Sequence, residues 1–304
     1  MSRMGVSLAV LTLVLTAMAG QAQARAEDKD VARLVSFGGA CANCALSGRK
    51  LTGAKFTGAD FSRATLIGSD LRGAVFFGSN FANADLTRAD LRGAEMRGAN
   101  FANANFTDAR MSGVESSGAN FQNAILVRVD LSSSELHGAH MAGANMSRAN
   151  LSNAELTGSN LASVNARDAD FRNAELNAAN LTGARFDMAD FRNAEFNGAN
   201  LRGAVFHGAD MRNADFGGAM LGGADLSGAK GLNQDQLDEA CGDSATRLPR
   251  GLTLKPCNGG RREIRVIVDF HRAQAEAAKA QAQAAKAAAA AIPKPPKPPA
   301  PPRY

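Results

Sequence analysis

Four cysteines are the residues of this chain best suited to chemistry. Cys41 and Cys44 form a C-x-x-C motif, a spacing used for redox exchange and for metal binding. Cys241 and Cys257 enclose a short loop near the other end, and we expect them to pair, since closing such a loop contributes about 3 kcal/mol. A zinc site would need a second ligand pair near Cys41, and we predict none.

Two of the four histidines, His137 and His140, are close together and lie beside Glu135. Imidazole is a common metal ligand, but the sequence offers no evident third ligand, and surface side chains at a turn are the better interpretation. A Ser-His-Asp arrangement would need a pocket, which the pattern described next does not provide. We therefore predict no catalytic residue, no metal site and no bound cofactor.

A five-residue repeat positions all of these side chains. From Cys41 to Leu226 every fifth residue is Leu, Phe or Met, apart from Cys41 itself, Ser116 and Ala166, and a small residue, usually Ala, lies two positions earlier. A helix would need a period of 3.6 and a half-buried strand a period of 2. A short repeat kept this long indicates stacked structural units rather than a globular domain with a pocket.

A longer period of 20 residues gives the number of units in one turn. Glu recurs at this spacing on six positions: Glu95, Glu115, Glu135, Glu155, Glu175 and Glu195. Four units per turn describe a square coil, in which residues 20 apart stack at about 4.8 Å. Gly and Asn, as at Gly53 and Asn103, suit the turn two residues after each large residue.

The stacking predicts columns of like side chains. The predicted core includes Phe61, Phe81, Phe101, Phe121, Leu151, Phe171 and Phe191, with the first four forming an aromatic column. Asn80, Asn100 and Asn120 should form an amide ladder of the kind that stabilises stacked strands. Arg92, Arg172 and Arg192 lie three residues before a Glu of the 20-residue series, and we expect them to relieve the repulsion between those carboxylates.

The pentapeptides Ala-Asp-Leu-Thr-Arg at 84–88 and Ala-Asn-Leu-Arg-Gly at 199–203 resemble the A(D/N)LXX pattern of the pentapeptide repeat family. The resemblance covers 41–230 and implies an all-β solenoid, a right-handed quadrilateral β-helix without a shared catalytic site. Some family members resemble DNA in shape and charge and bind DNA gyrase. Here the repeats are close to neutral and an export signal precedes them, so we disfavour a DNA-mimicking, gyrase-binding role.

Direct binding of nucleic acid is not expected either, because the basic residues are spread along the repeats and the tail lacks interleaved aromatic residues. Cys41 and Cys44 fall on the inward-facing phases of the repeat, in the first turn of the coil. They are therefore structural residues in our interpretation, either free and buried or bridged to each other.

The two ends of the chain differ in composition from the repeats. Residues 1–24 resemble a secretory signal peptide, with Arg3, an apolar run and Ala22-Gln23-Ala24 at the cleavage site. We expect a periplasmic or secreted protein, without membrane association after cleavage; the alternative is an uncleaved anchor. Residues 25–40 form the candidate N-terminal cap.

After the repeats, 231–260 form the candidate C-terminal cap, which contains the Cys241–Cys257 pair and a helix start at Asn233 and Gln236. The Ala-rich residues 261–291 favour a C-terminal α-helix, either a solvated spacer or an oligomerisation or membrane-surface helix. Residues 292–304 form a basic, Pro-rich, disordered tail, a spacer or a docking peptide.

The predicted function is a non-enzymatic, exported protein-interaction scaffold of the cell envelope, whose protein partners are unknown. The alternative is a passive structural spacer without a specific ligand. A homo-oligomer formed through the C-terminal region is a further expectation. One candidate interaction strip stands out, because Ser112, Ser132 and Ser152 occupy positions that carry Arg in other turns.

Overall fold

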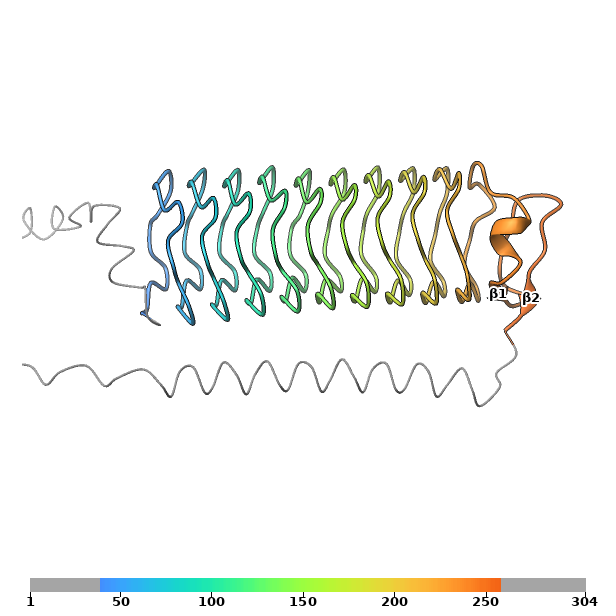
Figure 1. Cartoon of the computed structure of the whole chain (residues 1–304), viewed down its shortest axis with the longest axis horizontal. Coiled ribbons are helices and arrows are strands. Elements are labelled where there is room, and N and C mark those ends of the chain that lie inside the picture. The colour runs from blue at the N-terminus through green and yellow to red at the C-terminus, as the bar shows by residue number, and fades with distance from the viewer. Residues whose placement is uncertain (1–38, 258–304) are drawn as a thin grey trace, which may run out of the picture.

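The computed structural model describes residues 39–257, which form a rod of stacked square turns (Figure 1). Each five-residue unit makes one parallel β-bridge to the residue 20 positions later, from Ala40↔Asp60 through Asp210↔Lys230. The predicted all-β solenoid with four units per turn is therefore confirmed. The predictions for 1–24, for most of 25–40, for 261–291 and for 292–304 lie outside the described residues.

Backbone hydrogen bonds join every turn to the next. The amide of Phe61 donates to the carbonyl of Asn80 at 2.7 Å, and the amide of Asn80 donates to the carbonyl of Ala59 at 2.8 Å. Within each unit a tight turn closes the corner, as between the amide of Ala64 and the carbonyl of Phe61. From Asn43 to Gly223, the residue two after each inward-pointing anchor residue has a positive φ, 57° at Asn103, and this explains why Gly and Asn are common there.

The large residues and the small residues two positions before them fill the inside of the coil as one continuous hydrophobic core. Phe61, Phe81, Phe101 and Phe121 stack with ring centroids 4.8, 5.1 and 5.1 Å apart. Leu151 is fully buried and lies in a different column, in which Phe171 and Phe191 stack with their ring centroids 4.8 Å apart. Aromatic stacking at this spacing is favourable in addition to the burial of apolar area.

The last turn is covered by a short cap. It contains the 3₁₀-helix η1 (Asp235–Leu237) and two short paired strands, β1 (Cys241–Gly242) and β2 (Lys255–Pro256). Asn233 and Gln236 accept a hydrogen bond from each other's backbone amide, so the expected helix start forms, but it yields only a single 3₁₀ turn. Leu237 is buried against the core.

The strand β1 continues the sheet of the rod, because Cys241 bridges to Met220. The described part of the chain ends at Cys257, the residue after β2, which pairs with β1 (Figure 1). Within residues 39–257 no helix is long and apolar enough to cross a membrane.

Candidate interaction surface

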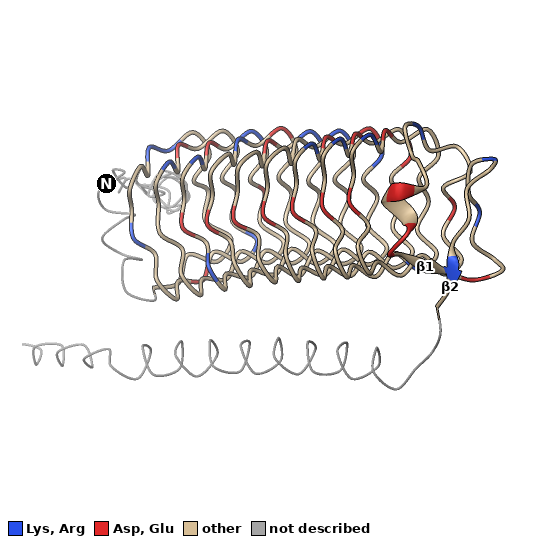
Figure 2. Ribbon diagram, turned by 45° about the vertical axis from the view of Figure 1, so that its right-hand side comes forward, with Lys and Arg blue, Asp and Glu red and all other residues tan. Residues whose placement is uncertain are grey.

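The outside of the rod consists of straight rows, because residues 20 apart lie above one another. Figure 2 shows that charge follows these rows: one row mixes basic and acidic residues, and another is acidic. A side chain type that recurs every 20 residues thereby becomes a ladder about 4.8 Å per rung. Two ladders, one of Arg and Asp and one of Glu, carry the charge of these rows.

In the first ladder each Arg binds the Asp two residues before it. Arg172 donates from Nε and Nη2 to both carboxylate oxygens of Asp170, and Arg192 does the same with Asp190. The prediction that Arg92, Arg172 and Arg192 relieve the Glu series is therefore wrong. Side chains two residues apart in an extended segment point to the same side, whereas each Glu lies beyond the next corner.

These pairs keep both partners charged. The hydrogen bond from Arg212 lowers the pKa of Asp210, and the same contact from Arg72 holds the pKa of Asp70 well below its usual range. Arg72, Arg172 and Arg192 also lie near the Asp of the following turn, with 3.9 Å between Arg192 Nε and Asp210 Oδ2. The pairs of Arg172 with Asp170, Arg192 with Asp190 and Arg212 with Asp210 therefore carry no net charge.

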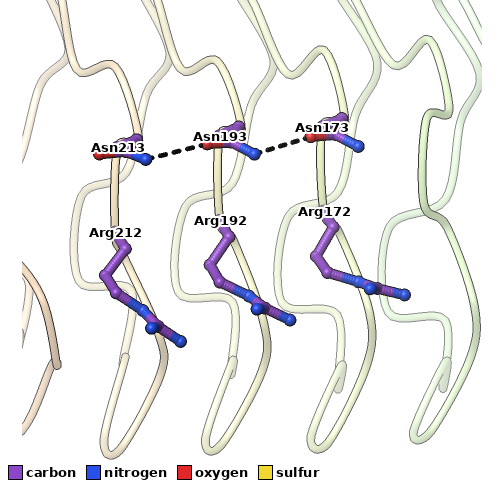
Figure 3. Close-up of a pocket in the computed structure, with 6 residues that line it drawn as sticks. All are labelled: Arg172, Asn173, Arg192, Asn193, Arg212 and Asn213. Carbon is purple, nitrogen blue, oxygen red and sulfur yellow. Dashed lines mark hydrogen bonds between the residues drawn. The ribbon is translucent and has the colours of Figure 1, made fainter.

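A shallow groove of about 300 Å³ runs along the C-terminal part of this face. Its lining is three Arg and three Asn on successive turns: Arg172, Asn173, Arg192, Asn193, Arg212 and Asn213 (Figure 3). The Asn side chains form an amide ladder, in which Asn193 Nδ2 donates to Asn173 Oδ1 at 3.0 Å. The guanidinium groups extend side by side in one direction from the row of amides.

The groove presents hydrogen-bond donors. Nη1 of each of the three Arg has no partner among residues 39–257, and each Asn Nδ2 uses one of its two protons within the ladder. The sequence prediction missed this feature. The recurrence of Asn153, Asn173, Asn193 and Asn213 at the 20-residue spacing was the signal that could have revealed it.

The predicted strip of Ser112, Ser132 and Ser152 lies in the middle of the same row, where Ser takes the place of the paired Arg. Its side chains are half-buried, and Ser132 Oγ donates to Asp130 Oδ1 at 2.7 Å while Ser152 Oγ donates to Asn150 Oδ1 at 2.8 Å. The hydroxyls of Ser132 and Ser152 therefore already have partners, unlike the Nη1 donors of the groove.

The second ladder contains the six Glu, one per turn, followed by Asp215. His137 Nε2 lies 2.7 Å from Glu155 Oε2, so this histidine belongs to the acidic row. His140 lies instead in the Asn series, bridged to Asn120 and Asn160, on the neighbouring face. Within residues 39–257 no three His, Cys, Asp or Glu side chains gather as metal ligands would.

The cysteine sulfurs lie in two pairs at bonding distance. Cys41 Sγ is 2.15 Å from Cys44 Sγ in the first turn, and Cys241 Sγ is 1.96 Å from Cys257 Sγ in the C-terminal cap. Cys41 is buried under the first turn and Cys44 is half-buried. Each pair lies at one end of the described rod.

These features define a repeat solenoid with ladder-like faces. A model of the pentapeptide repeats matches residues 41–78, 79–114, 117–153, 154–192 and 189–228, in 8 copies, and the chain therefore belongs to the pentapeptide repeat family. No curated protein sequence matches the chain significantly.

Several solved structures of pentapeptide repeat proteins are similar. HetL from Nostoc sp. strain PCC 7120, involved in heterocyst differentiation regulation, is 26% identical, with 67% of this chain and 92% of HetL covered and a TM-score of 0.40. Full-length QnrB1, a plasmid-mediated fluoroquinolone resistance protein, is 20% identical over 74% of this chain and 95% of QnrB1, with a TM-score of 0.38. A protein of the Arabidopsis thaliana thylakoid lumen is 26% identical over 49% and 86%, with a TM-score of 0.18.

Proposed function

We propose that this chain is a non-enzymatic scaffold that binds a protein partner in the cell envelope, and that the groove lined by Arg172, Arg192 and Arg212 is its docking site. The observation that supports this function is the row of unused donors at a constant interval of about 4.8 Å. A solenoid filled with side chains lacks the enclosed pocket that catalysis needs, while its flat faces suit extended contacts.

The spacing of the donors indicates what kind of partner fits. Neighbouring strands of any β-sheet lie about 4.8 Å apart, so a sheet that carries one row of acceptor side chains offers an oxygen to each rung. Because Arg and Asp neutralise each other in this row, short-range hydrogen bonds rather than net charge would hold the partner. Binding should therefore persist at salt concentrations that screen surface charges.

Export to the envelope rests on the signal-like residues 1–24 and on the cysteine pairs, which suit an oxidising compartment. The test of this part is fractionation of cells that produce the chain. Recovery from the periplasm or medium with all four cysteines oxidised is expected. A cytoplasmic chain with reduced cysteines would refute export.

The chain supplies a matched variant for testing the docking site. Replacing Arg172, Arg192 and Arg212 by Ser copies the natural Asp130–Ser132 rung, in which the hydroxyl takes over the bond to the carboxylate. The control replaces Arg72 and Arg92 by Ser. These two Arg lie outside the groove, and each binds the Asp two residues before it in the same way.

Affinity capture of envelope proteins by the wild-type chain and by both variants then tests the site. A partner kept by wild type and control, even at high salt, but lost by the triple variant would support the groove. Capture that is equal for all three would place the contact elsewhere. The absence of any specific partner for the wild-type chain would favour the passive spacer.

A further inference from the structure

Every second carboxylate of the acidic ladder has a side-chain partner. Arg97 binds Glu115, His137 binds Glu155, and Asn177 Nδ2 donates to Glu195 at 2.9 Å. The three partners are 40 residues apart, so they recur every second turn. The face thus has a period of two turns, although the fold itself repeats every turn.

The other carboxylates have no side-chain partner within residues 39–257: Glu95, Glu135, Glu175 and Asp215, all exposed. Within residues 39–257 the carboxylate of Asp215 accepts one hydrogen bond, from the backbone amide of Gly217. These four charges lie two turns apart, about 9.6 Å from one to the next. A complementary surface would carry cations at the same interval, in a straight row.

The residues beyond the described rod contain such a row in their sequence. Arg265, Arg272, Lys279 and Lys286 are each seven residues apart, within the Ala-rich stretch 261–291. In an α-helix a spacing of seven residues brings side chains to one side at intervals of about 10.5 Å. We propose that residues 265–291 form a helix that lies along the acidic face of its own rod, running antiparallel to the direction in which the turns advance.

The point where the chain leaves the rod agrees with this direction. Cys257 lies beside the last turn, on the face next to the acidic ladder, because β1 continues the row of Asn200 and Met220. Residues 258–264, when extended, reach about 23 Å, which is enough to turn one corner of the coil. The helix would then start at Asp215 and finish near Glu95.

This direction fixes the register of the contacts. The pairs are Arg265 with Asp215, Arg272 with Glu175, Lys279 with Glu135, and Lys286 with Glu95. The two intervals differ by about 0.9 Å per pair, or about 2.7 Å over three steps, which long Lys and Arg side chains can accommodate. Each exposed pair is weak alone, but a tethered segment has a high effective concentration at its own rod.

Zero-length carbodiimide cross-linking of the full chain tests the register, because it joins a Lys amine to a carboxylate in direct contact. We expect links from Lys279 to Glu135 and from Lys286 to Glu95. Glu135→Gln should remove only the first link. The control Glu155→Gln changes a carboxylate of the intervening turns, which already has a partner, and both links should survive.

A mixture of isotopically light and heavy chains shows whether the links form within one chain. Mixed-mass links at these positions would mean that the segment docks on a second copy, and they would overturn the proposal. It would also be overturned if Lys279 and Lys286 reacted no more than Lys294 and Lys297 of the tail. Neither result depends on the Arg side chains of the partner groove, which lies at the corner before the acidic face.

Trypsin digestion gives an independent measurement, because the four basic residues of the proposed helix are cleavage sites. Replacing Glu95, Glu135 and Glu175 by Gln should make cleavage at these sites about tenfold faster at low salt. The control replaces Asp85, Asp130 and Asp225 by Asn, which the chain itself uses in the equivalent Asn105–Thr107 and Asn150–Ser152 rungs. Equal cleavage of both variants and the wild type would refute docking on the acidic face.

Discussion

Phe101 offers the sharpest test of how the coil is held together. Its ring is fully buried, stacked between Phe81 and Phe121 at 5.1 Å on each side, with an edge contact to Phe106 at 5.3 Å. Phe101→Ala should therefore cost about 4 kcal/mol, the usual loss for removing a buried ring. Phe101→Leu should cost only about 2 kcal/mol, because Leu fills this column in later turns and only the ring contacts are lost.

Urea unfolding followed by far-UV circular dichroism measures these losses. Asn103→Asp is the control from the same turn, since Asn103 is exposed with φ at 57° and Asp108 adopts the same conformation at 59°. It should change the free energy of unfolding by no more than about 0.5 kcal/mol. Similar losses for Phe101→Ala and Asn103→Asp would refute the assignment of the inward phase. The order of the three losses is the criterion, because repeat arrays can depart from two-state unfolding.

Two further predictions concern the turns and the charged rows. Met188 is exposed with φ at 61°, a conformation that costs a non-glycine residue about 1 kcal/mol, so Met188→Gly should raise the free energy of unfolding in urea; a lower value would refute strain at this turn. The pKa of Asp210 is lowered by its bond to Arg212, so its contribution to stability is complete above the unfolded pKa of about 4 and is lost as the pH falls through the lower folded value. Circular dichroism along an acid titration should therefore show unfolding at higher pH for the Arg172, Arg192 and Arg212 to Ser variant than for the wild type, and coincident curves would contradict this role of the pairs.

The interior could be predicted from the sequence because one rule governs it. Each large residue must point inward, and a shift by one position would expose it to water, so the phase of Phe61 or Leu151 determines where its side chain lies. The 20-residue recurrence of Glu and Asn then gave the number of units per turn, because like residues align only when the turns have equal length.

The partners of surface side chains could not be predicted in the same way. Arg92 is two residues from Asp90 and three from Glu95, and the sequence spacing alone does not show that a corner separates Arg92 from Glu95. The choice depends on the path of the backbone between the residues. The extent of the groove at Arg192 and Asn193 likewise depends on which side chains leave space between neighbouring rungs.

Contacts with the two charged ladders should differ in their sensitivity to salt, because the Arg side chains of the first ladder are paired, whereas only every second carboxylate of the second has a side-chain partner within residues 39–257. In the first ladder Arg192 binds Asp190 directly and lies near Asp210, so its field cancels within a few ångströms and only hydrogen bonds extend to a partner. In the second ladder Glu135 and its counterparts two turns away have no side-chain partner within residues 39–257, so they attract a basic segment over about a Debye length, 10 Å at 0.1 M salt. Raising the salt concentration should therefore release residues 265–291 from the acidic face while a partner stays bound in the groove. Release of both together would mean that the groove also works through net charge, which the pairing of Arg192 with Asp190 argues against.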